Sequence, residues 1–171
     1  MNFNYIDKLD VAGFADKVKK INIWDNYKFR QETYEAHQYT KTIPLVFDED
    51  FRHTDPTYHK TYFLFEKELK DIENIFIKKL GDGYTIRAIL VSLLANKSIP
   101  EHIDGGDSLH FCKRVHIPIT TNDKVFFKVG EEIKNIKTGE MWEINNSNKT
   151  HSVKNLSEKD RVHLIIDWVL K

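Results

Sequence analysis

The fold is decided by an apolar stretch in the middle of the chain, YTIRAILVSLL at residues 84–94. Its Ile, Leu, Val and Thr content is typical of a strand. Toward the C-terminus, further stretches have strand character at residues 111–120, 124–129, 140–145 and 161–170. Short strands separated by roughly 10 to 20 residues favour a sandwich or a jelly-roll barrel.

Toward the N-terminus, the periodicity changes to that of helices. Apolar residues recur at i, i+3 and i+4 spacing across residues 60–80, and Gly81 follows a last turn that carries Lys78 and Lys79. A shorter amphipathic pattern predicts a helix over residues 10–20. Residues 22–44 are aromatic and polar without a clear period, and we interpret them mostly as loop with an edge strand.

These elements predict an α+β fold that is mainly β, with the N-terminal helices packed on one outer face of the sheets. An open antiparallel sheet with helices on one side is the alternative. We expect one domain over residues 1–171, with residues 1–83 as a helical and loop support segment and residues 84–171 as the catalytic core. A chain of 171 residues has room for one core of useful size.

The composition excludes several classes of protein. The 26 Lys and Arg residues balance the 26 Asp and Glu residues, which argues against a dedicated nucleic-acid or membrane-surface binder. Cys112 is the single cysteine, and the N-terminus lacks the apolar segment of a secretion signal. We therefore expect a cytoplasmic protein with a small-molecule or protein partner.

The pattern that could carry chemistry is His102-Ile103-Asp104. Residues two apart along a strand point to the same side, so both side chains can bind one metal ion. A third candidate ligand, His151, follows a polar loop about fifty residues later. Two histidines and one carboxylate form the facial arrangement of non-haem Fe(II) oxygenases. A structural zinc site usually needs thiolates, which one cysteine cannot supply.

A second His-x-Asp pattern, His53-Thr54-Asp55, is followed by Pro56 in a polar stretch without strand character. We interpret this pair as a surface loop.

The chain from Ser92 to Asp167 resembles a known family on several motifs taken together in order. The motifs are Ser92-Leu93-Leu94, Ile99-Pro100-Glu101-His102-Ile103-Asp104, Arg114-Val115-His116-Ile117-Pro118-Ile119, Gly139-Glu140, His151-Ser152-Val153-Lys154-Asn155 and Arg161 through Asp167. They are similar to the catalytic core of the aspartyl/asparaginyl β-hydroxylase-like group of 2-oxoglutarate-dependent Fe(II) dioxygenases, and also to bacterial proline hydroxylases.

The resemblance implies a double-stranded β-helix of the cupin or jelly-roll type that holds Fe(II) through His102, Asp104 and His151. It also implies that Arg161 binds the distal carboxylate of 2-oxoglutarate, with Ser92 as a second cosubstrate contact. The Leu-x-Pro-Gly turn common before the first ligand is replaced here by Leu94-Ala95-Asn96-Lys97. Ascorbate is a candidate stimulant of such an enzyme.

A charge balance supports the arginine independently. Fe(II), the Asp104 carboxylate and dianionic 2-oxoglutarate sum to one negative charge, which a closed site must neutralise. The planar fork of Arg161 suits that task. Arg114 and His116 share one face of their strand, opposite an apolar row, and if that row packs on the core, they line the cavity. A second inward arginine would then suit a substrate carboxylate. The alternative is that Arg114 and His116 form a polar row on the outer face of the strand.

The function these observations favour is hydroxylation of an amino acid or short peptide residue, of the Asp, Asn or Pro type, with O2 as co-reactant and succinate and CO2 as products. A jelly-roll module that binds a metal or ligand without turnover is the alternative. A cupin enzyme that does not use 2-oxoglutarate ranks last, because such sites usually present His-x-His.

Overall fold

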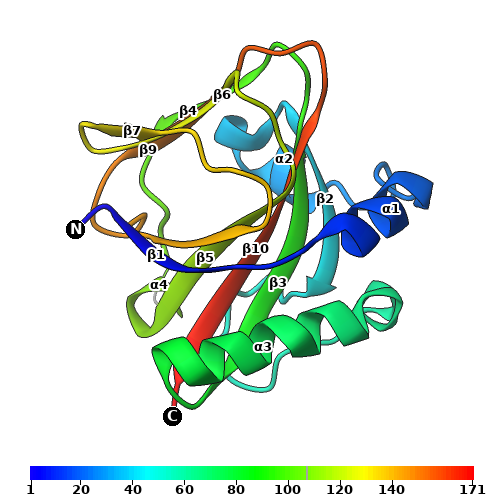
Figure 1. Cartoon of the computed structure of the whole chain (residues 1–171), viewed down its shortest axis with the longest axis vertical. Coiled ribbons are helices and arrows are strands. Elements are labelled where there is room, and N and C mark those ends of the chain that lie inside the picture. Colours follow the sequence, from blue (N-terminus) through cyan, green and yellow to red (C-terminus); the bar gives the residue numbers. More distant parts are fainter. Residues whose placement is uncertain (107) are drawn as a thin grey trace.

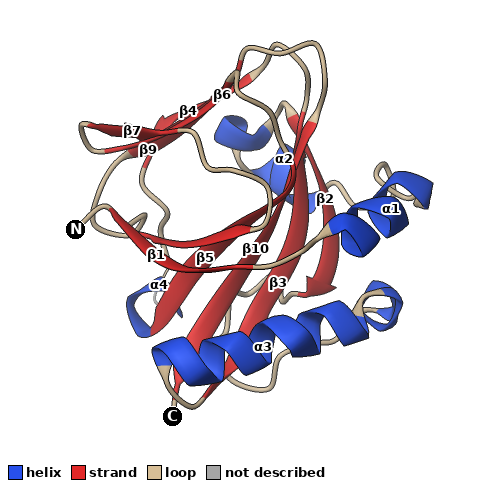
Figure 2. Cartoon of the chain, viewed as in Figure 1, coloured by secondary structure: helices blue, strands red, loops and turns tan. Residues whose placement is uncertain are grey.

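The computed structural model describes residues 1–106 and 108–171, which form two antiparallel sheets that face each other (Figures 1 and 2). The larger sheet has the strand order β1-β8-β5-β10-β3-β2. Its strands are β1 (Phe3–Lys8), β8 (Glu140–Ile144), β5 (Cys112–Thr120), β10 (Arg161–Leu170), β3 (Gly83–Leu93) and β2 (Thr40–Val46). The smaller sheet has the order β4-β9-β6-β7. Its strands are β4 (Ser98–His102), β9 (His151–Asn155), β6 (Val125–Val129) and β7 (Glu132–Lys134).

The two long helices cover the outer face of the larger sheet (Figure 2). Helices α1 (Ala12–Lys20) and α3 (Glu66–Leu80) place their apolar stripes in one core with the outward-facing residues of β3, β5 and β10. That core includes Phe14, Val18, Leu69, Ile72, Phe76, Leu90, Val115, Ile117, Leu164 and Ile166. The predicted α+β fold with helices on one outer face is confirmed, and the second sheet excludes the open single-sheet alternative.

The helix predicted over residues 60–80 is divided into two. A 3₁₀ segment, η2 (Lys60–Leu64), precedes α3, and Phe65 between them has φ −123° and ψ 11°. The Phe65 side chain is fully buried and stacks on Phe14 with 4.7 Å between ring centroids. Burial of this ring in the core therefore goes with a break in the helix that periodicity alone does not reveal.

The sheets also include residues that precede Tyr84. β2 is the edge strand expected within residues 22–44, whereas β1, at the opposite edge, was not expected at all. Three short helices complete the chain: α2 (Phe29–Thr33), η1 (Glu35–His37) and α4 (Ser108–Phe111). The segment 1–83 therefore supplies strands of the larger sheet as well as helices and loops.

The space between the sheets is divided into an apolar end and a polar end. Leu93, Ile99, Phe127, Val129 and Val153 belong to the apolar cluster. At the polar end, a cavity of about 890 Å³ opens between the larger sheet, the loop after β4, and the α2–η1 segment. Strand alternation aims the polar residues of β3, β5 and β10 into this space, because their apolar neighbours pack against the helices.

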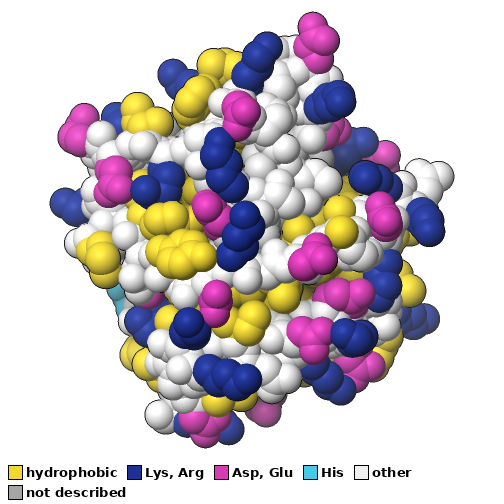
Figure 3. Space-filling view, in the orientation of Figure 1, with side chains coloured by type: hydrophobic (Ala, Val, Ile, Leu, Met, Phe, Trp, Pro, Cys, Tyr) yellow, Lys and Arg dark blue, Asp and Glu magenta, His cyan; other side chains and the backbone are white. Residues whose placement is uncertain are grey.

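Acidic and basic side chains are interspersed on the face shown in Figure 3. Among the described residues, the helices are too short or too polar for any of them to span a bilayer.

Candidate active site

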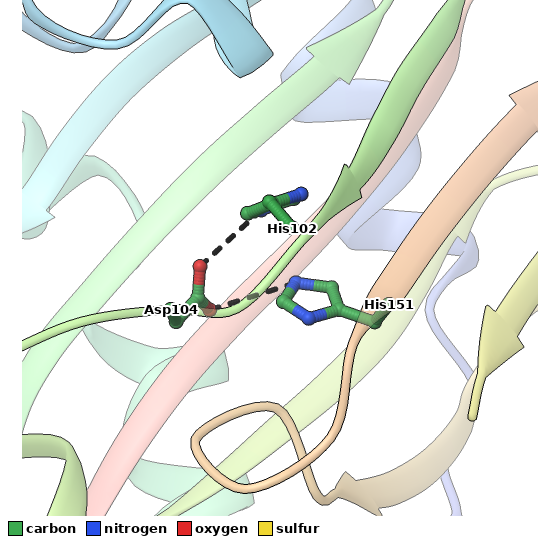
Figure 4. A group of neighbouring side chains, drawn as sticks. All are labelled: His102, Asp104 and His151. Carbon is green, nitrogen blue, oxygen red and sulfur yellow. Dashed lines mark ion pairs between the residues drawn. The ribbon is translucent and has the colours of Figure 1, made fainter.

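Three side chains expected as metal ligands converge at the polar end of the sheets. β4 pairs with β9 in a register that sets His102 directly opposite His151, and Asp104 follows two residues after His102. One potential ligand atom from each residue lies within 4.8 Å of the other two. His102 Nε2 lies 3.3 Å from Asp104 Oδ1, and His151 Nε2 lies 3.7 Å from Asp104 Oδ2 (Figure 4). This donor set, two imidazoles and one carboxylate, fits a facial Fe(II) site.

The hydrogen bond of His102 orients its ring for metal binding. Its Nδ1–H donates to the carbonyl oxygen of Pro100 at 2.8 Å, which assigns the lone pair of the neutral ring to Nε2, the atom that faces Asp104. Burial lowers the pKa of His102, but the bonds to Asp104 and Pro100 outweigh it and raise the pKa overall. Burial lowers the pKa of His151 to about 4, so this ring is neutral and available as a ligand at pH 7.

The Asp104 carboxylate is held from the side by Arg114 and Asn146. Arg114 Nη1 donates to Asp104 Oδ2, and Asn146 Nδ2 donates to the same oxygen at 2.5 Å. Burial would raise the pKa of Asp104, but the positive charge of Arg114, together with His102 and His151, outweighs it and keeps the pKa well below its ordinary value. The carboxylate is therefore ionised and fixed in position beside both histidines.

Arg114 is itself fixed by a buried aspartate. Its Nε and Nη2 donate to the two carboxylate oxygens of Asp167 at 2.7 and 2.8 Å, a bidentate pair, and Arg87 Nη1 donates to Asp167 as well. Register explains the pair, because Asp167 lies directly opposite Arg114 between β10 and β5. Of the two interpretations of the sequence, the one that places Arg114 on the cavity side is observed. Its charge is already paired with the carboxylates of Asp167 and Asp104.

Arg161 lies deeper in the space between the sheets and is 1% exposed. Its Nε and Nη1 have no hydrogen-bond partner among residues 1–106 and 108–171. Burial, and to a smaller extent the charge of Arg30, lower the pKa of Arg161 to about 9, so the guanidinium remains charged near neutral pH. A buried cation with free donors beside the metal-ligand trio fits the distal carboxylate of 2-oxoglutarate.

The structure brings six of the seven predicted site residues to one place. His102, Asp104, Arg114, His116, His151 and Arg161 all line a small pocket that adjoins the larger cavity. Ser92 does not join them. It pairs with Val162 and shares the parity of Ala88 and Leu90, whose side chains pack against the helices. Because Ser92 therefore lies on the opposite face of the sheet, its expected contact with the cosubstrate is corrected here.

The second His-x-Asp pattern contributes no donor to the trio. His53 and Asp55 lie in an exposed loop between β2 and η2, as expected, and the ring of His53 packs with its centroid 5.3 Å from that of Phe111. His53 also lines the cavity of about 890 Å³.

Four buried polar residues in or near the site were not identified from the sequence. Arg30 and His37 come from the segment without a clear period, and they line both the cavity and the small pocket. His163 is buried on the face of β10 that carries Arg161, and neither ring nitrogen has a partner among the described residues. Asp167 is 0% exposed, and the polar residues at alternate positions of the apolar stretch 161–170 are the one signal that could have identified it and His163.

Comparisons with known proteins agree with this geometry. The sequence model of the family described as Aspartyl/Asparaginyl beta-hydroxylase matches residues 15–170. Among curated proteins, no match was found.

Several solved structures share the fold. An oxidoreductase of the 2OG-Fe(II) oxygenase family from Burkholderia pseudomallei has 12% sequence identity and a TM-score of 0.61, over 95% of this chain and 91% of that one. AviO1 from Streptomyces viridochromogenes Tue57 has 11% identity and a TM-score of 0.59, over 98% and 89%. A prolyl hydroxylase from Trichoplax adhaerens, in complex with a hypoxia inducible factor peptide fragment, has 11% identity and a TM-score of 0.54, over 98% and 83%. At these identities the likeness shows a common fold.

Proposed function

Since the chain belongs to the aspartyl/asparaginyl β-hydroxylase family, and is thus an oxidoreductase of the hydroxylase type, we propose that it is an Fe(II)- and 2-oxoglutarate-dependent dioxygenase. Its substrate is an amino acid or a residue of a short peptide, of the Asp, Asn or Pro type, and the products include succinate and CO2. The whole chain, residues 1–171, acts as one dioxygenase domain, because strands from both of its halves build the sheet that carries the site.

The observation that carries the proposal is the combination of a His-Asp-His trio with a buried arginine that has no ion-pair partner in the part of the chain that the structure describes. The trio supplies three ligands on one side of a metal ion, and Arg161 offers free donors to an anion in the same pocket. When bound, Fe(II) and 2-oxoglutarate supply the oxidising power that inserts one oxygen atom of O2 into a C–H bond.

The protein's own contribution is to position the metal and the cosubstrate and to neutralise their charge. His102, Asp104 and His151 hold the metal, and Arg114, itself held by Asp167, keeps the Asp104 carboxylate ionised and oriented. Arg161 binds the distal carboxylate of 2-oxoglutarate. His116, whose Nδ1 has no partner among the described residues, contacts the metal-side end of the cosubstrate. Arg114 is thus assigned a positioning role instead of the substrate contact that its charge first indicated.

The test measures iron binding and the release of CO2 from labelled 2-oxoglutarate, with ascorbate present and with amino acids and short peptides added in turn. The wild-type protein binds one Fe(II) and decarboxylates 2-oxoglutarate faster when a substrate is present. His151→Ala removes one of three ligands, so iron binding and turnover are lost while the chain stays folded. Full iron affinity in this variant would contradict the assignment.

The control is Asp55→Asn, at the second His-x-Asp pattern. Because Asp55 lies in an exposed loop and lines neither the cavity nor the small pocket with the metal ligands, neither iron affinity nor turnover changes. Stoichiometric iron binding by the wild type without any decarboxylation would identify a binding module that lacks turnover.

A further inference from the structure

Among the residues that the structure describes, a second arginine is buried in the cavity without an acidic partner. Arg30, in α2, is 9% exposed, and its Nη2 donates to Nε2 of His37 at 2.9 Å. Burial, and then the charge of Arg30, lower the pKa of His37 to about 2, so His37 is a neutral acceptor. Arg30 Nη1 has no partner within residues 1–106 and 108–171. The guanidinium is thus bonded on one side and free on the other.

The charges buried around the cavity do not balance. Among residues 1–106 and 108–171, the cations are the buried Arg30, Arg87 and Arg161 and the mostly buried Arg114, whereas the carboxylates near them are Asp104 and Asp167, which leaves two positive charges. Bound Fe(II) and dianionic 2-oxoglutarate cancel each other, so the surplus persists in the loaded site. The other charged residues of the lining, Glu35, Asp50 and Arg52, are exposed to solvent at the rim. A buried surplus of this kind is stabilised by an anion.

Among the described residues, the ion pairs show which cation has neither a carboxylate partner nor an assigned ligand. Arg87 and Arg114 both bind Asp167, and Arg161 is assigned to the cosubstrate. Arg30 remains. It lies where the small pocket with the metal ligands meets the cavity of about 890 Å³, and the ring of its partner His37 packs 5.5 Å from the ring of His102. An anion bound to Arg30 would therefore lie on the entrance side of the metal centre.

Part of the cavity wall is apolar. Phe47, Phe51, Ile89 and Ile165 line the same cavity. A ligand that satisfies both parts of the wall has an acidic group for the guanidinium and an apolar body for these side chains.

From this arrangement we infer that Arg30 is the substrate-anchoring residue, and that the substrate is a small carboxylic acid with an apolar body, its carboxylate bound by the free side of the Arg30 guanidinium. This inference rests on the proposed function, since it names the substrate class of that same cavity. The N-terminal segment α2–η1 is then part of the substrate site, and the sheets supply the metal and cosubstrate sites.

The experiment compares acids with their own amides on protein loaded with Mn(II) and 2-oxoglutarate, which binds without the turnover that iron would support. The probes are L-proline and L-prolinamide, L-leucine and L-leucinamide, and cyclopentanecarboxylate with its carboxamide, measured by isothermal titration calorimetry at pH 8. At least one acid binds tenfold or more tightly than its amide. Acids and amides that bind equally, or no binding by any acid, overturn the inference.

Three variants assign that preference to Arg30. Arg30→Gln removes the preference for the acid, and Arg30→Lys, which keeps the charge but loses the fork, retains part of it. Lys28→Gln is the matched control, because it removes a positive charge two residues away on an exposed side chain, and it retains the full preference. An unchanged preference in Arg30→Gln overturns the inference, and the acid-to-amide comparison on the wild type stands even where a variant folds poorly.

Affinity for 2-oxoglutarate, measured separately on the Mn(II)-loaded protein, distinguishes the two proposals. Arg30→Gln leaves it within twofold of the wild type. A large loss would assign Arg30 to the cosubstrate and overturn the inference. A wild-type protein that prefers acids through Arg30 but does not bind 2-oxoglutarate would contradict the proposed function and leave the inference standing.

Discussion

At the scale of single residues, Arg161 is the side chain whose environment most directly indicates an anion-binding site. A guanidinium that is 1% exposed and has two unpartnered nitrogens among the described residues is costly, because its desolvation is not offset by hydrogen bonds. Bound carboxylate would offset that cost through parallel charge-assisted bonds.

Replacing Arg161 therefore affects the cosubstrate more than the metal. In Arg161→Ala, removal of one partner of a buried charge pair weakens 2-oxoglutarate binding by ~2–5 kcal/mol, and Arg161→Lys weakens it less because the charge remains. Titration of the Mn(II)-loaded protein with 2-oxoglutarate measures both losses, and Mn(II) affinity itself is unchanged. Normal 2-oxoglutarate affinity in Arg161→Ala would place its distal carboxylate elsewhere in the cavity.

The sequence predicted the trio and Arg161 but not the partners that hold them. His102, Asp104 and His151 could be selected because a two-residue spacing on a strand has a geometric meaning. Arg30 could not, because nothing in a segment without periodicity distinguishes a buried arginine from a solvated one. The Arg114–Asp167 pair depends on strand register between residues 53 apart, which only the folded sheet reveals.

At the scale of elements, the loop between β7 and β8 is fixed by Gly139. This residue has φ +78°, a conformation that favours glycine, and a Cβ placed there would lie 2.1 Å from the carbonyl oxygen of Leu9. The backbone N–H of Leu9 donates to Gly139 O at 2.9 Å, and the N–H of Gly139 donates to Pro118 O at 2.9 Å. The close approach ties the chain that leads into α1 to the larger sheet.

Gly139→Ala is therefore expected to destabilise the protein by ~1–3 kcal/mol, since the added methyl group must displace backbone. Urea denaturation followed by circular dichroism measures the change. The matched control is Gly13→Ala in α1, where a Cβ meets nothing within 4 Å and a helix-favouring residue stabilises by about 0.5–1 kcal/mol. Equal effects of the two substitutions would contradict this account.

Elements with strong periodicity were predicted well, and the features that were not predicted, the break at Phe65 and strand β1, have local causes. The apolar spacing of α1 and α3 and the β-branched composition of β3 and β10 agree with the observed elements. The break at Phe65 was missed because Phe65 keeps the apolar spacing of the helix while leaving its backbone conformation. β1 was missed because a short edge strand with alternating polar residues has little signal of its own.

At the scale of the whole molecule, buried neutral histidines make stability depend on pH. Burial is the first cause that lowers the pKa of His37 to about 2 and of His151 to about 4, and burial with nearby arginines holds the pKa of His116 and His163 well below the ordinary value. On unfolding near pH 5, each of these rings takes up a proton that the folded state does not bind. Stability therefore falls as pH falls below about 6.5. His102, whose pKa is raised, opposes this trend only above about pH 6.5, because at lower pH the folded and unfolded states both bind its proton.

We expect the free energy of unfolding of the metal-free protein to fall steeply from pH 7 to pH 5. Each lowered histidine contributes up to ~1.4 kcal/mol per pH unit in this range. Urea denaturation at several pH values in the presence of a chelator measures the slope. His163→Gln reduces the number of protons taken up on unfolding by about one, and the slope falls accordingly. His110→Gln, a substitution of an exposed side chain, leaves the slope unchanged. A stability that is flat between pH 7 and pH 5 would contradict the neutral burial of these rings.

The unpartnered Arg161 guanidinium also has a consequence for how long the protein survives. An anion that binds only the folded chain, at a concentration a hundred times its Kd, lowers the unfolded population by about a hundredfold, or ~2.7 kcal/mol. Proteases that cleave only opened molecules act in proportion to that population. If 2-oxoglutarate is the anion, digestion of this protein slows as the metabolite accumulates, so its abundance rises with the supply of its own cosubstrate.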